Sequence, residues 1–157
     1  MIESPPPGTS LALDSDVFND WRFLRPKTIE SITQYQAERK DLPALTSFTV
    51  FESLIGFEKQ ASQSALQESQ RQARRFAENL VRSCTVLPFD QAAAEIAAYI
   101  FGRMGHAQGN RLRKDVFIAS TAIAHGYGLV SRNRRDFELI ADLVPAGRNL
   151  YLEIWKR

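Results

Sequence analysis

Short apolar segments alternate along this chain with longer segments of helical periodicity. The candidate strands cover residues 10–13, 44–47, 84–89, 128–131 and 149–155. The candidate helices cover about 26–39, 48–60, 62–82, 91–104 and 115–125, and the GHAQGN segment at 105–110 is predicted to be a loop. Strands that alternate with helices are typical of a parallel sheet with helices on both faces. The sequence therefore predicts an α/β fold, a three-layer α/β/α sandwich with a central parallel sheet.

The length of the chain favours one domain. With 157 residues, it falls within the usual size of a single domain. We expect a domain over residues 11–157, preceded by a flexible, proline-rich lead-in over residues 1–10 (MIESPPPGTS). A single cysteine, Cys84, allows no disulfide within the chain. No apolar run reaches the ~20 residues of a membrane span, and the first residues lack the pattern of a signal peptide. We therefore expect a cytoplasmic protein with no membrane partner.

Oxygen-bearing side chains follow the predicted strands or open the helices after them. They are Asp14, Asp16, Glu52, Asp115, Asn133 and Asp136. The carboxyl ends of parallel strands meet at one edge of a sheet, which is where such folds bind ligands. Carboxylates are natural ligands of Mg²⁺ and Mn²⁺, and without a cation they would repel each other. The set predicts a site for Mg²⁺ or Mn²⁺, although each residue alone could instead be a turn former or a helix cap. Glu58, further along the helix of Glu52, ranks second to it.

Two groups of cations flank these acids, although the formal net charge is only +2. They are Arg111, Arg113 and Lys114, and Arg132, Arg134 and Arg135. They could contact the phosphates of RNA or simply face solvent. His106 and His125 are interpreted as structural, since metal-assisted hydrolysis needs no histidine. Trp21 and Phe23 are interpreted first as aromatic residues of the core or of a dimer interface, and stacking on RNA bases is the second alternative.

Four segments together resemble one family, the PIN domain, and within it the VapC-type toxins of toxin–antitoxin pairs. LALDSDVF at 11–18 is similar to the opening hhLDTNhh motif, and TVFESLIGFEK at 49–59 is similar to the helix that carries an acidic site residue. DVFIASTAIAHGYGLVSRNRRDF at 115–137 resembles D-x-x-I-A-A-x-A-x-x-x-G-x-x-L-V-T-x-N-x-x-D-F most closely, with Ser120 in place of the more usual Ala. LPFD at 87–90 is a weaker match. The resemblance spans about residues 11–155.

The resemblance implies a metal-dependent endoribonuclease that is the toxin of a type II toxin–antitoxin system. It implies Asp14, Glu52, Asp115 and Asp136 as catalytic residues and Asp14 and Asp115 as the principal ligands of Mg²⁺ or Mn²⁺. Glu52, Asn133, Asp136 and Asp16 would support the metal, and whether Asn133 or Asp136 meets it stays open. The implied partners are an RNA substrate, with transfer RNA among the candidates, a cognate antitoxin and a second copy of the chain.

Other functions remain compatible with parts of the sequence. A phosphatase of the haloacid dehalogenase type would use Asp14 as nucleophile and Asp16 as acid and base, but Phe18 stands where that motif has Thr or Val. A non-catalytic PIN-like module would bind RNA or protein, although such modules usually lack part of the acidic set. A response-regulator receiver would need a central acceptor Asp and a late Lys, and neither is evident.

Overall fold

Five parallel strands form one central sheet. The computed structural model describes residues 2–157. The strands are β1 (Leu11–Leu13), β2 (Ala44–Thr46), β3 (Val86–Leu87), β4 (Gly128–Ser131) and β5 (Leu152–Ile154). They lie in the order β3-β2-β1-β4-β5, and every neighbouring pair is parallel. Leu13 of β1 is paired with Leu45 of β2 on one side and with Val130 of β4 on the other. The first strand along the chain is therefore the central strand of the sheet.

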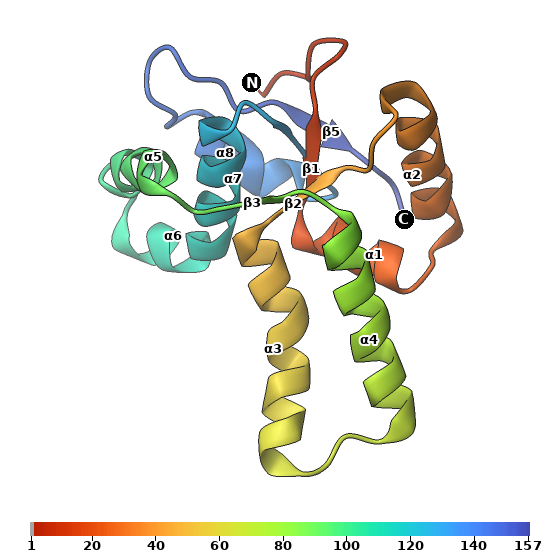
Figure 1. Cartoon of the computed structure of the whole chain (residues 1–157). Helices are drawn as coiled ribbons and strands as arrows, with labels where there is room; N and C mark the ends of the chain where they lie inside the picture. The colour runs from red at the N-terminus through yellow and green to blue at the C-terminus, as the bar shows by residue number, and fades with distance from the viewer. Residues whose placement is uncertain (1) are drawn as a thin grey trace.

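Helices cover both faces of this sheet. They are α1 (Ser15–Arg22), α2 (Pro26–Arg39), α3 (Ser47–Gln63), α4 (Glu68–Ser83), α5 (Gln91–Phe101), α6 (His106–Arg111), α7 (Arg113–Ala124) and α8 (Arg134–Ala141). On one face, α1, α2 and α4 bury a core that includes Phe18 and Tyr35. On the other, α5, α7 and α8 bury a core that includes Ile118 and Phe137. The predicted three-layer α/β/α fold with a central parallel sheet is confirmed (Figure 1).

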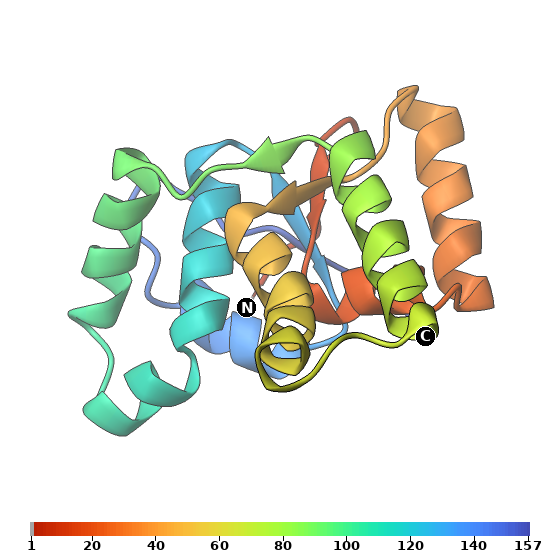
Figure 2. The same ribbon diagram turned by 60° about the horizontal axis from the view of Figure 1, so that its bottom comes forward.

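Helices α3 and α4 form a long antiparallel pair that projects from the body of the protein (Figure 1). Figure 2 shows α3 beside α7 and in front of α1, so its first turns lie over the edge of the sheet where β1 and β2 end. Thr46 caps α3 by accepting a hydrogen bond from the backbone N of Thr49 at 3.2 Å. This edge brings together the starts of α1, α3 and α7.

Several predicted element boundaries need correction. The segment 105–110 is not a loop, because His106–Arg111 forms α6 and the buried Leu112 anchors its end. The helix predicted over 62–82 begins only at Glu68, since α3 continues to Gln63 and a short loop follows. The strand predicted over 84–89 shortens to β3. Helices α1 and α8 were not anticipated from the sequence.

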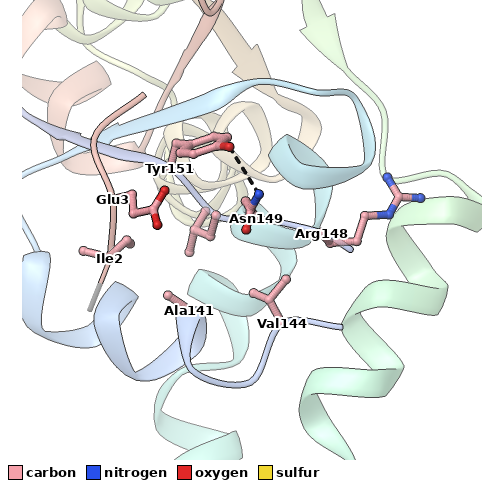
Figure 3. Close-up of a pocket in the computed structure, with 8 residues that line it drawn as sticks. Ile2, Glu3, Ala141, Val144, Arg148, Asn149 and Tyr151 are labelled. Atoms are coloured by element: carbon pink, nitrogen blue, oxygen red, sulfur yellow. Dashed lines mark hydrogen bonds between the residues drawn. The ribbon is translucent and has the colours of Figure 1, made fainter. Parts of the chain in front are cut away.

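The lead-in lies against the body of the protein at the amino end of β5. Ile2 is buried, and Glu3 forms an isolated parallel bridge with Tyr151. Both line a small polar hollow of about 100 Å³, in which the Asn149 amide donates a hydrogen bond to the Tyr151 hydroxyl at 3.2 Å (Figure 3). The flexibility of residues 1–10 stays a prediction. Within residues 2–157, no helix is both long and apolar enough to span a membrane.

Candidate functional site

Asp14 lies at the centre of the carboxyl edge of the sheet, directly after β1. It caps α1, and its carboxylate accepts hydrogen bonds from the Ser15 backbone N and the Ser131 Oγ, both at 2.8 Å. The side chain is only 5% exposed. Burial, followed by the charges of Asp16 and Asp115, raises the pKa of the Asp14 carboxyl despite these hydrogen bonds. Asp14 is therefore held firmly in a place where a second negative charge destabilises its ionised form.

Asp115 enters the same space from the first turn of α7. It is 6% exposed, and within residues 2–157 its carboxylate accepts no hydrogen bond and forms no ion pair. Burial raises the pKa of Asp115 to about 6; Lys114 opposes the rise, whereas Asp136, Glu52 and Asp16 add to it. Ser120 Oγ is the one buried side-chain polar atom without a partner in residues 2–157, so the Asp115 oxygens reach the surface of the site, where a ligand can contact them.

Glu52 approaches from the second turn of α3 and is held on both oxygens. Ser15 Oγ donates a hydrogen bond to Oε1 at 2.6 Å, and the Lys114 ammonium lies 3.2 Å from Oε2. Burial alone would lower the pKa of Lys114, but Glu52, Asp115 and Asp14 together raise it. Glu58, the second-ranked residue, instead forms an ion pair with Arg74 of α4, two turns further along the projecting helices.

Asp136 stands in the first turn of α8, where Asn133 is the N-cap. The Asn133 amide donates to Asp136 Oδ2 at 2.8 Å, and Arg111 Nη1 lies 2.8 Å from Oδ1. Burial favours a higher pKa, but the hydrogen bonds from Arg111 and Asn133 outweigh it and hold the pKa of Asp136 below its ordinary value. Asn133 therefore orients Asp136, and both of its amide atoms are used within α8.

Asp16 and Arg132 link α1 to the turn after β4. The Arg132 backbone N donates to Asp16 Oδ2 at 3.1 Å, and its guanidinium Nε lies 3.0 Å from Oδ2 of the buried Asp20. Arg157 also lies 3.5 Å from Asp20. These contacts hold the Arg132 side chain against α1, and its role in RNA binding stays a prediction.

The remaining predicted cations are more exposed. Arg113 donates to the Asn110 amide oxygen at 3.1 Å, and Arg134 forms an ion pair with Glu138 at 3.2 Å. Arg135 is exposed and close enough to lower the pKa of Asp136 through its charge. Arg111 and Lys114 contact Asp136 and Glu52 directly, and Arg132 lies 3.8 Å from Asp16.

The structure thus brings the predicted acids together and adds residues that the sequence did not single out. Ser15 and Ser131 donate to Glu52 and Asp14, and the signal for both was their position next to a strand end. Asp20 carried no such signal, because only the folded structure places it against Arg132. A cleft of about 200 Å³ opens beside the acids between α1 and α3; its lining includes Asn19, Ser53 and Lys114.

The donor set suits a divalent cation. All the converging groups are oxygen donors, which Mg²⁺ and Mn²⁺ prefer, and Asp115 is a buried carboxylate that nothing in the described chain satisfies. Within residues 2–157, no three His, Cys, Asp or Glu side chains are already arranged to hold one ion. Glu52 and Asp136 are turned toward Lys114 and Arg111 instead. Asp14 and Asp115 are the carboxylates whose raised pKa values a cation would relieve.

A family model, the PIN domain, matches residues 11–143 of the chain. The chain belongs to the PIN domain family. This match confirms the resemblance drawn from the sequence motifs, and it contains Asp14, Glu52, Asp115 and Asp136. No curated protein matches the chain.

Solved structures of similar fold contain toxin–antitoxin complexes. A chain of DNA-bound VapBC from Salmonella typhimurium aligns with a TM-score of 0.67 and 21% identity, over 94% of this chain and 99% of that one. A chain of VapBC2 from Rickettsia felis, bound to a DNA fragment from its promoter, aligns with a TM-score of 0.66 and 18% identity. The alignment covers 93% of this chain and 98% of that one. A chain of VapBC-1 from nontypeable Haemophilus influenzae aligns with a TM-score of 0.61 and 21% identity, over 94% of this chain and 98% of that one. This PIN domain therefore shares its fold with chains of VapBC complexes over nearly its full length.

Proposed function

We propose that this PIN domain is a metal-dependent endoribonuclease and the toxin of a type II toxin–antitoxin system. The observation that carries the proposal is the buried Asp115 carboxylate, which has no hydrogen-bond donor within residues 2–157 and lies within electrostatic reach of the buried Asp14. A site that destabilises its own ionised carboxylates is suited to a cation. The fold that it shares with chains of VapBC complexes supports the assignment to a toxin–antitoxin system.

Asp14 and Asp115 would hold Mg²⁺ or Mn²⁺, and Glu52 and Asp136 would complete the site. When bound, the ion lowers the pKa of a water molecule for attack on phosphorus and stabilises the leaving oxygen. Ser131 and Ser15 keep Asp14 and Glu52 in place through hydrogen bonds of 2.8 and 2.6 Å. We assign Asp136, rather than Asn133, as the fourth acidic group, because the Asn133 amide is occupied in orienting Asp136.

Arg111 and Lys114 would exchange their carboxylate partners for RNA phosphates. Each is more than half exposed, so the exchange requires little rearrangement of the backbone. Arg113, Arg134 and Arg135 lie on the surrounding surface and would add charge attraction that weakens with salt. A cognate antitoxin, a homodimer, a cytoplasmic location and transfer RNA as a target stay predictions for this chain.

Membership of the PIN family removes the support for the phosphatase and receiver alternatives, because both rested on isolated motif fragments. A non-catalytic PIN-like module is the remaining second candidate. It would bind RNA without cutting it, and the complete acidic set argues against it.

The test is cleavage of a mixed cellular RNA pool that includes transfer RNA, with Mg²⁺, with Mn²⁺ and with EDTA. We expect the wild type to cut discrete sites with metal, and Asp115→Ala and EDTA each to abolish cutting. Glu52→Gln should reduce the rate strongly, whereas Glu58→Gln, a matched change on the same helix, should leave it unchanged. RNA that stays intact under every condition, while still bound, would establish the non-catalytic module instead.

A further inference from the structure

The cleft between α1 and α3 continues away from the acidic side chains along one face of α1. Ser15 and Asp16 lie at its start, and Asn19 follows one turn later. Arg22 and Phe23 come after a second turn, about 10 Å from Ser15 at 1.5 Å per residue. The lining from α3 includes the hydroxyl side chain of Ser53. The polar cleft therefore lies beside the proposed reaction centre, and Arg22, which contacts Asn19 of its lining, and Phe23 follow on the same helix.

The amide of Asn19 is oriented by a neighbour in this cleft. Arg22 Nη1 donates a hydrogen bond to Asn19 Oδ1 at 3.1 Å, which leaves the amide NH₂ group as a donor. Within residues 2–157, that NH₂ group donates to no acceptor. Exposed amides of this kind can read the edge of an unstacked base.

The end of α1 exposes a flat hydrophobic ring in a fixed position. Phe23 is 65% exposed, so of its predicted roles a place in the core is wrong, whereas a dimer interface and base stacking both need an exposed ring; Trp21 is buried, as expected for a core residue. The Phe23 backbone N donates to Asn19 O at 3.0 Å, and Leu24 adopts a left-handed φ of 55° that ends the helix. The ring is therefore held at the surface by a defined turn.

Arg22 lies between the Phe23 ring and α3. Its guanidinium lies 5.6 Å from the centre of the Phe23 ring and 5.2 Å from that of Phe57, and burial lowers the pKa of Arg22. Stacking on an aromatic ring or a guanidinium plane is the usual way in which single-stranded RNA bases are held.

We propose that the α1–α3 cleft is a subsite for single-stranded RNA, in which Asn19 contacts the nucleotide next to the cleaved phosphate and Arg22 with Phe23 stacks a base. The inference rests on the proposed ribonuclease function. RNA fits better than a protein segment because the cleft is continuous with the acidic site and its lining is made of amide, hydroxyl and charged groups.

The chain offers matched controls for both residues. Asn79 accepts a hydrogen bond from Arg82 at 3.1 Å on α4, with the same spacing as Asn19 and Arg22. Tyr99 of α5 lies under the guanidinium of Arg103 at 3.4 Å and is exposed like Phe23. Asn79→Ala and Tyr99→Ala therefore remove equivalent side chains outside the cleft.

The first experiment measures binding without cleavage. A fluorescein-labelled pool of random single-stranded RNA 12-mers is titrated with Asp115→Asn protein, alone or combined with each substitution, and followed by fluorescence anisotropy. We expect Phe23→Ala to weaken binding roughly tenfold, as loss of one stacked base does. Asn79→Ala and Tyr99→Ala should leave the Kd unchanged. Equal binding by all variants overturns the subsite and leaves Phe23 as a protein-contact surface.

The second experiment sequences the cut ends of the same RNA pool after digestion with Mn²⁺. We expect Asn19→Ala to change the base preference beside the cut, while the protein still cuts. An unchanged preference overturns the subsite but not the ribonuclease, which Asp115→Ala tests separately. If the wild type neither binds nor cuts RNA, both proposals fall.

Discussion

Replacing Asp115 by asparagine is expected to stabilise the metal-free protein at neutral pH. The Asp115 carboxylate is buried, has no hydrogen-bond donor within residues 2–157 and stands near three other acids, and these conditions raise its pKa from 3.8 to about 6. Asparagine keeps the shape but removes the charge. The variant should therefore lose the catalytic centre and gain stability, as is common where function requires a strained site.

The size of the effect follows from the pKa. A rise of about two units corresponds to about 3 kcal/mol at 1.36 kcal/mol per unit, and solvent screening reduces this to an expected gain of about 1–3 kcal/mol. The folded protein binds more protons than the unfolded chain between pH 3.8 and about 6. Stability from this residue is thus greatest below pH 3.8, falls as the pH rises through that window and stays low above it. The advantage of Asp115→Asn should appear over the same window.

The assay is urea unfolding of both proteins in EDTA between pH 4 and 8. A gain of about 1–3 kcal/mol corresponds to a rise in Tm of roughly 2–10 °C for a chain of this size. Asp136→Asn is the matched control: its pKa is lowered by Arg111 and Asn133, so its loss should destabilise the protein at neutral pH. Added Mg²⁺ should stabilise the wild type but not Asp115→Asn, which lacks a principal ligand. An Asp115→Asn protein no more stable than the wild type at pH 7.5, or equally stabilised at every pH, would refute the reasoning.

Three further changes test other parts of the structure. Ser120→Ala should raise the free energy of unfolding by about 1 kcal/mol in urea titrations, because the buried Ser120 hydroxyl has no hydrogen-bond partner within residues 2–157. Asp90→Ala should lower it by about 1 kcal/mol, because Asp90 caps α5 by accepting from the Ala93 backbone N at 3.0 Å; Asp90→Asn, which keeps the cap, should recover most of the loss. Cys84 should resist iodoacetamide at pH 8 until urea unfolds the chain, because burial and then the charge of Asp41 raise the pKa of its thiol to about 12; rapid native labelling would contradict this.

The sequence was most informative where one residue pattern had one physical solution. The apolar GLVS segment was predicted to be a strand, and it forms the fully buried β4 beside the central strand β1. The helix predicted to end at residue 125 has its C-cap there, followed by Gly126, whose φ of 75° is the left-handed conformation that glycine adopts most readily. The helix predicted from residue 91 begins there, capped by Asp90.

The sequence was less informative where a segment was compatible with two kinds of secondary structure. The two glycines of GHAQGN favoured a loop, yet residues 106–111 form α6, and a Cβ at Gly109 would already be 3.6 Å from the Phe101 ring. Close packing against α5, which no local pattern reveals, decides the outcome.

In the candidate site too, the sequence predicts some residues and not others. Positions after strands identified the acids, because parallel strands end at a common edge. Partners from distant segments could not be identified in this way: Lys114 meets Glu52, and Arg111 meets Asp136, only after the helices have packed. The sequence also could not decide whether Phe23 lies in the core or at the surface, because the position of its ring depends on how α1 ends.

The central position of β1 sets the order in which the protein can become active during its synthesis. Asp14 is made early, but its hydrogen bond from Ser131 joins residues 117 positions apart, and β1 lacks one of its two neighbours until β4 exists. At translation rates of about 5–20 residues per second, that interval lasts roughly 6–23 seconds. During it, the ribosome carries a chain whose acidic site is incomplete. If the proposed ribonuclease function holds, the chain should not cut RNA until the segment between Asp14 and Ser131 has been translated.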